Sequence, residues 1–119
     1  LMACGTKEKI EIVKRFTERN RFKKTTLKEA ASSIYLSPKY LSRLFKETTG
    51  QSFSDYRFDV KMDTAKELFQ KTVYNINLVS DRLGYENAES FIRQFKNRTK
   101  LTPTEYRNKI RRKKNRVKK

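Results

Sequence analysis

Apolar side chains recur along this chain at intervals of three and four residues, the spacing that gathers them on one face of an α-helix. The first such stripe, between residues 7 and 21, consists of Ile10, Val13 and Phe16, with Ile12 as a further candidate. Similar stripes follow at residues 26–34, 37–48, 52–71, 75–83, 87–98 and 102–113. The pattern therefore predicts an all-α protein of about seven helices.

Residues that cap helices stand at the starts of most of these stretches. Ser37 is followed by Pro38, which fits the first helical position because its missing N–H is not needed there. The remaining predicted starts are Thr25 or Thr26 with Glu29, Ser52 or Ser54, Asn75 or Asn77, Asn87, and Thr102 with Pro103 and Glu105. Gly50 suits the left-handed residue that ends many helices.

The stretch Leu36–Phe45 reads LSPKYLSRLF and predicts a short cationic helix with one buried side. Leu41, Leu44, Phe45 and Thr48 fall on the inner side, and Lys39, Ser42, Arg43 and Lys46 on the outer side. A shorter helix with Leu27, Ala30, Ala31 and Ile34 on its inner side precedes it across a tight turn. This order is the helix-turn-helix layout, in which the second helix enters the DNA major groove. A helical hairpin alone is weak evidence for DNA binding.

Residues 35–57 are repeated by residues 85–107 at an offset of fifty. The identical positions are Tyr35/Tyr85, Arg43/Arg93, Phe45/Phe95, Lys46/Lys96, Thr49/Thr99, Tyr56/Tyr106 and Arg57/Arg107. Upstream the offset becomes forty-nine, which predicts one extra residue in the second turn, absorbed at Gly84. Repetition of apolar and polar positions together indicates two copies of one unit. Between them, the helix at residues 52–71 would be roughly 30 Å long, close to the roughly 34 Å of one B-DNA turn.

Charge narrows the choice of partner. The chain has 30 basic and 13 acidic residues, a net charge of +17. The last thirteen residues hold nine of the basic side chains, yet residues 7–106 still hold 21 basic against 13 acidic. A domain that is basic throughout favours a nucleic-acid partner.

Several classes of protein are excluded or disfavoured by composition. The chain has no histidine, and Cys4 is its only cysteine, so neither a zinc finger nor a histidine-dependent catalytic triad is possible within it. We expect no metal, no cofactor and no enzymatic activity. No stretch approaches the roughly 20 apolar residues of a membrane span, so we expect a soluble, cytoplasmic protein with no membrane partner. The start at Leu1 suggests a fragment that lacks an N-terminal domain.

The blocks SPKYLSRLFKETTG at residues 37–50 and GYENAESFIRQFK at 84–96, followed by TPTEYR at 102–107, resemble the DNA-binding domain of AraC/XylS-type transcriptional regulators. The resemblance covers residues 7–110. It implies two helix-turn-helix subdomains joined by a long linker helix, with recognition helices at about 37–48 and 87–98 in adjacent major-groove segments. Three residues depart from the family pattern: Lys100 replaces a usual glycine, Ser80 a usual alanine, and Lys61 a usual arginine.

The resemblance also implies which residues meet DNA. Base readers are expected at Lys39, Ser42 and Arg43 in the first unit and at Ala88, Glu89, Ile92 and Arg93 in the second. Arg43 and Arg93 are the strongest candidates, because a guanidinium group matches the two acceptors of guanine. Phosphate contacts are expected at Ser37, Tyr40, Lys46, Asn87, Ser90, Lys96 and Asn97. Arg57 and Arg107 are expected to touch phosphate or to pack.

The predicted organisation is a disordered remnant at residues 1–6, a first subdomain at 7–51, a linker helix at 52–71, a second subdomain at 72–113 and a basic tail at 114–119. The expected partners are double-stranded promoter DNA, RNA polymerase, and an N-terminal sensor or receiver domain outside this chain. The alternative is a basic helical protein that binds RNA or the ribosome, which charge alone would also explain.

Overall fold

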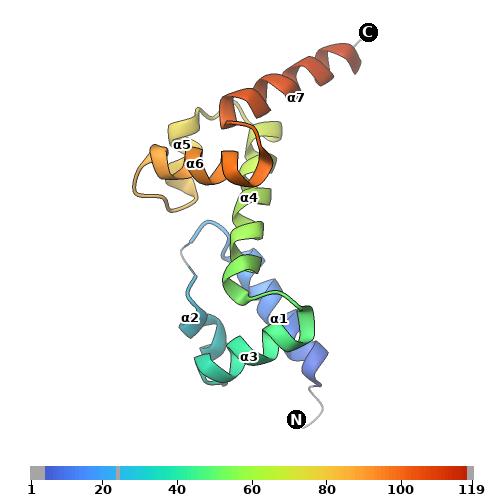
Figure 1. The fold of residues 1–119 in the computed structure, drawn as a ribbon, viewed down its shortest axis with the longest axis vertical. Helices are drawn as coiled ribbons and strands as arrows, with labels where there is room; N and C mark the ends of the chain where they lie inside the picture. The colour runs from blue at the N-terminus through green and yellow to red at the C-terminus, as the bar shows by residue number, and fades with distance from the viewer. Residues whose placement is uncertain (1–4, 24, 118–119) are drawn as a thin grey trace. The chain divides into compact units, whose positions relative to one another are not determined.

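The computed structural model describes residues 5–23 and 25–117, with side chains described as far as residue 113. The described residues form seven helices and no strand (Figure 1). The helices are α1 (Thr6–Arg19), α2 (Leu27–Ser32), α3 (Pro38–Thr49), α4 (Phe53–Lys71), α5 (Ile76–Arg82), α6 (Ala88–Thr99) and α7 (Pro103–Val117). The all-α prediction is therefore confirmed. The expectations for residues 1–4, including Cys4, and for the side chains of residues 114–119 lie outside the described part.

The chain divides into two units, residues 1–61 and 62–119, and α4 contributes residues to both. In the first unit α1, α2 and α3 pack against one another. Their shared core consists of Ile10, Val13, Ala30, Ala31, Leu41, Leu44, Phe45 and Phe53. The ring of Phe45 meets that of Phe53 edge-on, at a centroid distance of 5.6 Å. The paired alanines allow α2 to approach α3 closely, as their small size predicts.

In the second unit α5 packs on α6, and α6 packs on α7. Phe69 of α4 lies among the aromatic residues of this core: its ring centroid is 5.7 Å from that of Phe95 and 6.2 Å from that of Tyr106. Phe95 and Tyr106 correspond to Phe45 and Tyr56 of the first unit, whose centroids are 5.4 Å apart. The repeated aromatic residues are therefore core residues in both units.

The predicted caps form. The Ser37 hydroxyl accepts from the Tyr40 N–H at 3.2 Å, and the Asn87 side chain accepts from the Ser90 N–H at 2.9 Å. Thr26 and Thr102 make capping boxes with Glu29 and Glu105, while Ser52 and Asn75 cap α4 and α5. Each cap satisfies a helix N–H that would otherwise lack a partner. The side-chain caps at Ser37 and Asn87 thus fix where α3 and α6 begin.

Two residues assigned to inner stripes by their spacing are exposed. Ile12 is 38% exposed and does not join the core. Thr48 lies on the outer side of α3, and its neighbour Thr49 instead bonds the Phe45 carbonyl at 2.8 Å. A threonine hydroxyl bonded to the preceding turn closes the helix end without being part of an apolar stripe.

The prediction for the second turn is wrong in detail. In the first unit the turn closes with the Leu36 N–H donating to the Ala31 carbonyl at 3.0 Å, after Tyr35 at a φ of 59°. In the second unit the Tyr85 N–H makes the matching bond, after Gly84 at a φ of 86°.

Gly84 therefore corresponds to Tyr35, and the Tyr35/Tyr85 identity is not a structural correspondence. The extra residue of the second unit is Glu86, between the closing residue of the turn and the cap of α6. The offset of forty-nine thus continues two residues further than the sequence comparison placed it.

The last helix also extends beyond its predicted end. It continues to Val117, one turn past Lys113, because no glycine or proline interrupts the basic sequence there. No helix in the described ranges combines the length and the apolar character that crossing a membrane requires.

Candidate nucleic-acid interface

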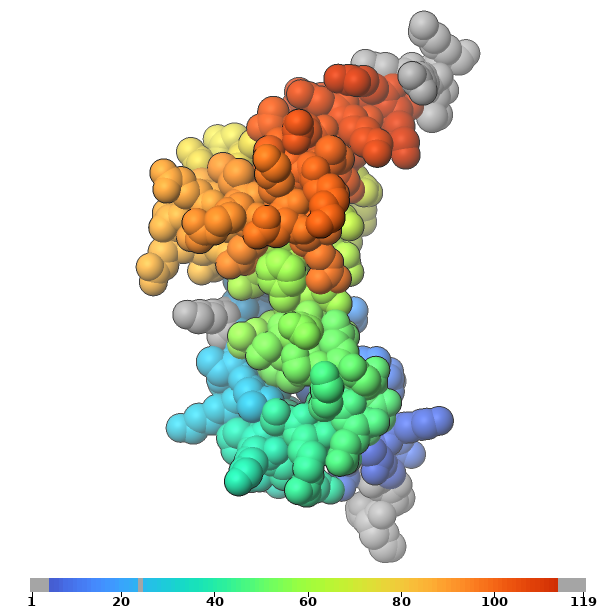
Figure 2. Space-filling model, in the orientation of Figure 1, coloured from blue at the N-terminus to red at the C-terminus, as the bar shows by residue number. Residues whose placement is uncertain are grey.

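The outer side of α3 carries the three base-reading candidates of the first unit. Lys39, Ser42 and Arg43 are all exposed, whereas Leu41 and Phe45 on the other side are fully buried. The packing that buries the apolar side therefore fixes which side chains face outward. Figure 2 shows that α3, in teal to green, and α6, in orange, each present an uncovered surface.

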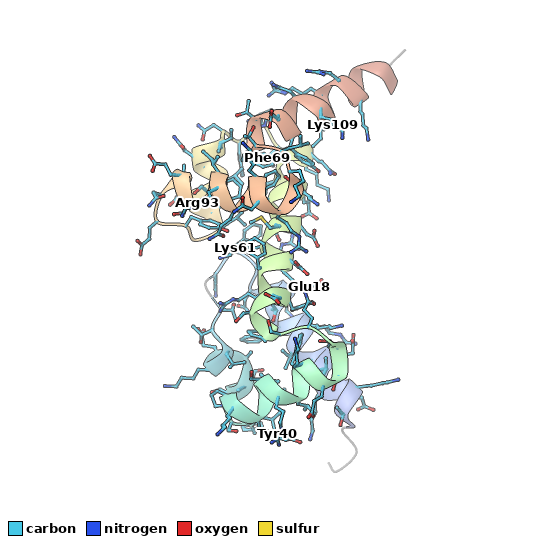
Figure 3. The ribbon with its side chains drawn as sticks, in the orientation of Figure 1. Glu18, Tyr40, Lys61, Phe69, Arg93 and Lys109 are labelled. Carbon is cyan, nitrogen blue, oxygen red and sulfur yellow. The ribbon has the colours of Figure 1, made fainter. Side chains whose placement is uncertain are left out.

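Arg43 has an aromatic neighbour within its own helix. Its guanidinium carbon lies 5.6 Å from the ring centroid of Tyr40, which is 39% exposed. A cation above an aromatic face is attracted by the ring, and this contact restrains a long, flexible side chain. Tyr40 can therefore orient Arg43 before any ligand arrives. Figure 3 labels Tyr40 on this side of the helix.

The outer side of α6 carries the candidates of the second unit, but they are not equally available. Glu89 and Arg93 are exposed, whereas Ala88 and Ile92 are half-buried. Ile92 follows the buried Phe91 in sequence, and part of its own surface is covered. The polar pair therefore dominates the accessible surface. Figure 3 shows Arg93 on α6, on the side away from Phe69.

Matched positions of the two helices differ in charge. At the offset of fifty, Lys39 corresponds to Glu89 and Ser42 to Ile92, while an arginine occupies the next position in both. Lysine donates hydrogen bonds only, and an ionised glutamate accepts them only. The two outer sides therefore share the cation pairs Arg43/Arg93 and Lys46/Lys96, but their other base-reading candidates differ chemically.

The phosphate-contacting candidates lie at the start and on the outer side of the same helices. Ser37, Tyr40, Lys46, Asn87, Lys96 and Asn97 are exposed, and Ser90 is half-buried. Ser37 and Asn87 use an oxygen to cap their helices, which leaves the serine O–H and the amide NH₂ as free donor groups. Helix N-termini favour anions through their unpaired N–H groups.

Arg57 and Arg107 pack rather than project outward, the second of the two roles that the sequence allowed. Arg57 donates from Nη1 to the Thr25 carbonyl, and Arg107 donates from Nη2 to the Tyr74 carbonyl. Burial lowers the pKa of Arg107, with a smaller contribution from the nearby Arg111.

Each accepting carbonyl belongs to the residue just before a helix cap, Thr26 or Asn75. The guanidinium carbons also lie over aromatic rings, 6.0 Å from the centroid of Phe53 for Arg57 and 5.0 Å from that of Phe69 for Arg107. Arg57 therefore ties the start of α2 to α4, and Arg107 ties the start of α5 to α7. We call these two sets of contacts the arginine clamps. The Arg57/Arg107 identity in the repeat singled out the two arginines in the sequence. Nothing in the sequence indicated which carbonyl groups they would bond.

A half-buried phenol, Tyr85, holds the turn before α6. The Tyr85 hydroxyl donates to the Gln94 side-chain oxygen at 2.5 Å, and burial raises the pKa of Tyr85 to about 12. The phenol therefore stays neutral and keeps its proton for this bond at neutral pH. Its ring also packs against Phe91, with centroids 5.3 Å apart. Sequence reasoning did not find this contact, because no spacing rule connects Tyr85 with Gln94.

The sequence and the fold both match known proteins. A model of the helix-turn-helix domain matches residues 30–109. The uncharacterised HTH-type transcriptional regulator YtdP of Bacillus subtilis is 37% identical over 82 residues, which are 69% of this chain and 11% of that protein. This chain therefore spans far less than two thirds of that relative.

Solved structures share the fold. The C-terminal domain of the two-component response regulator yesN from Fusobacterium nucleatum is 31% identical, with a TM-score of 0.76 over 82% of this chain and 95% of that one. The DNA-binding domain of AdpA, solved in complex with a target DNA, is 18% identical, with a TM-score of 0.80 over 87% of this chain and 94% of that one. At that identity the likeness to AdpA concerns the fold alone.

Two capped helix pairs, each presenting a cationic outer helix, define a double helix-turn-helix DNA-binding domain. The chain belongs to the AraC-type helix-turn-helix family of transcriptional regulators.

Proposed function

We propose that this domain recognises a specific duplex sequence through the outer sides of α3 and α6. The observation that carries the proposal is the pair Arg43 and Arg93, exposed at the same position of two helices whose caps and cores also match. In the described part of the chain neither arginine is held by a carboxylate. Each guanidinium group is therefore available to guanine O6 and N7.

The other exposed side chains divide between bases and phosphates. Lys39 and Ser42 supply donors beside Arg43, whereas Glu89 can accept from a cytosine amino group beside Arg93. Ala88 and Ile92 offer only apolar contact, which suits a thymine methyl group. Lys46, Lys96, Asn97 and Ser90, with the caps Ser37 and Asn87 and the Tyr40 hydroxyl, would hold the phosphate backbone and fix the register.

In the whole protein, this domain would act in the cytoplasm by binding promoter DNA rather than by catalysis. RNA polymerase is a proposed partner, as is an N-terminal sensor or receiver domain. Support for a receiver comes from the C-terminal domain of a response regulator among the proteins that share the fold.

Sequence selectivity tests the proposal against the RNA-binding alternative. A duplex enriched from a random pool should bind at least about a thousandfold more tightly than random duplex at physiological salt. Titration should be followed by fluorescence anisotropy at several salt concentrations, with a hairpin RNA of equal length as competitor. Equal affinity for all duplexes, or stronger competition by the RNA than by random duplex, would contradict the proposal.

A further inference from the structure

A groove of about 450 Å³ lies in the second unit, between α7 and the second half of α4. The segment after α6, at Thr99 and Leu101, closes one end of it. Its volume falls within the range of sites that bind small ligands or peptide side chains, roughly 300–1,000 Å³. The function proposed above makes no use of this groove.

The lining combines an apolar floor with a cationic rim. Leu101, Tyr106 and Ile110 are half-buried, and the Tyr106 hydroxyl accepts a hydrogen bond from Gln70 at 3.1 Å. The cations are Lys66 from α4 and Lys109 and Lys113 from α7. No carboxylate is among the described residues that line the groove.

Folding does not explain these three lysines. Within the described ranges none of them forms an ion pair. Lys109 and Lys113 are four residues apart on one face of α7, where like charges repel and weaken the helix slightly. A ligand with negative charges would relieve this repulsion.

The chemistry of the groove favours a protein over a nucleic acid. Phosphates would satisfy the lysines but would leave the apolar floor exposed. The groove also lies apart from the reading side of its own unit, since Figure 3 shows Lys109 on α7 and Arg93 on α6 at opposite sides of that unit. DNA on α6 would therefore leave the groove accessible.

We propose that this groove docks an acidic amphipathic helix of a partner protein. The apolar stripe of that helix would cover Leu101 and Ile110, and its flanking Asp or Glu residues would pair with Lys66, Lys109 and Lys113. Helices that lay an apolar face into a groove are a recurrent mode of peptide recognition. The proposal does not depend on the DNA sequence that the domain reads.

The test uses a fluorescein-labelled amphipathic peptide with leucines at positions i, i+3, i+4 and i+7, flanked by glutamates. We expect saturable binding in an anisotropy titration, with shifts of the Leu101 and Ile110 amide signals in an NMR titration. The double variant Lys109→Glu and Lys113→Glu should weaken binding about tenfold or more, since two close charge pairs become repulsive. Both lysines are exposed, so the variant should fold.

The matched control is Lys7→Glu with Lys28→Glu, which makes the same charge change on exposed lysines of the first unit. It should leave peptide affinity within about twofold of the unmodified chain, because neither lysine lines the groove and an unpaired exposed charge contributes little. An equal loss in both double variants would overturn the proposal. So would equal binding by a peptide with serine in place of leucine, or the absence of saturable binding.

An enriched DNA duplex separates this proposal from the function proposed above. The peptide should still bind when the duplex is present in excess, and displacement by the duplex would overturn the groove as a separate site. If the peptide binds as expected but no duplex is preferred over random DNA, only the proposed DNA recognition fails.

Discussion

At the scale of single residues, two side chains occupy backbone conformations that glycine tolerates better. Lys100 ends α6 with a φ of 69°, where the matching residue of α3 is Gly50 at 79°. Tyr35 has a φ of 59° and is 96% exposed, so no burial of its ring compensates for that conformation. A residue with a Cβ atom is strained in this region.

We expect Lys100→Gly to raise the free energy of unfolding by about 0.5–1 kcal/mol, because glycine relieves this strain. Gly50→Ala is the reciprocal change and should lower the free energy of unfolding by about 1 kcal/mol. The loss would come from the positive φ alone, because an added Cβ atom would meet nothing within 4 Å. Urea unfolding followed by circular dichroism measures both. As a control, Lys96→Gly within α6 should be destabilising. A loss of stability in Lys100→Gly would contradict the explanation.

The sequence marked only one of these two residues, Lys100, as standing where glycine is usual. The offset of fifty places it opposite Gly50, and both residues have a positive φ. Tyr35 was aligned with Tyr85 because the side chains are identical. The hydrogen bonds of the turn instead pair Tyr35 with Gly84, and a tyrosine in the sequence gives no sign of a positive φ.

At the scale of helices, each unit depends on an arginine clamp as well as on its aromatic core. Arg57 and Arg107 join helices that are distant in sequence by bonding the carbonyls of Thr25 and Tyr74. Lysine lacks the planar guanidinium group, which donates to the carbonyl and lies over the aromatic ring at the same time. It could therefore not replace either arginine fully. The clamps therefore explain two arginines that a search for DNA contacts would misassign.

Arg107→Lys should lower the free energy of unfolding by about 1.5–3 kcal/mol, the usual range for a lost hydrogen bond to a charged group. Thermal unfolding monitored by circular dichroism should show the loss. Below the unfolding temperature, the preference for an enriched duplex over random DNA should be unchanged. Arg93→Lys is the matched control, and we expect it to alter that preference while leaving stability within about 0.5 kcal/mol. The reverse pattern would assign Arg107 to the DNA interface.

Most helices could be predicted because their caps and stripes agree. A capping residue begins each stretch of apolar residues at helical spacing at Ser37, Asn87, Thr26 and Thr102. Local signals of this kind agree with the final fold, so they predict helices well. The clamp partners could not be predicted, since a carbonyl acceptor has no residue-specific signature. The end of α7 was missed for a similar reason: basic residues are compatible with both a helix and a frayed tail.

At the scale of the whole molecule, the two units share one architecture but present different chemistry. The first offers Lys39, Ser42 and Arg43, and the second chiefly Glu89 and Arg93. Matched positions that differ in charge should prefer different bases, so we expect the two parts of the binding site to differ in sequence. The burial that makes Ile92 a weaker candidate depends on packing, which the repeat alone did not reveal.

Selection from a random duplex pool, run in parallel with the unmodified chain, Arg43→Ala, Arg93→Ala and Lys46→Ala, tests the central claim most directly. The unmodified chain should enrich two distinct half-motifs. Each arginine variant should lose preference at one guanine, worth about 1–3 kcal/mol, in a different half-motif. Lys46→Ala should enrich both half-motifs unchanged, with weaker affinity for every duplex and a smaller salt dependence. If both arginine variants enriched the unaltered motif, α3 and α6 would not read bases through these side chains.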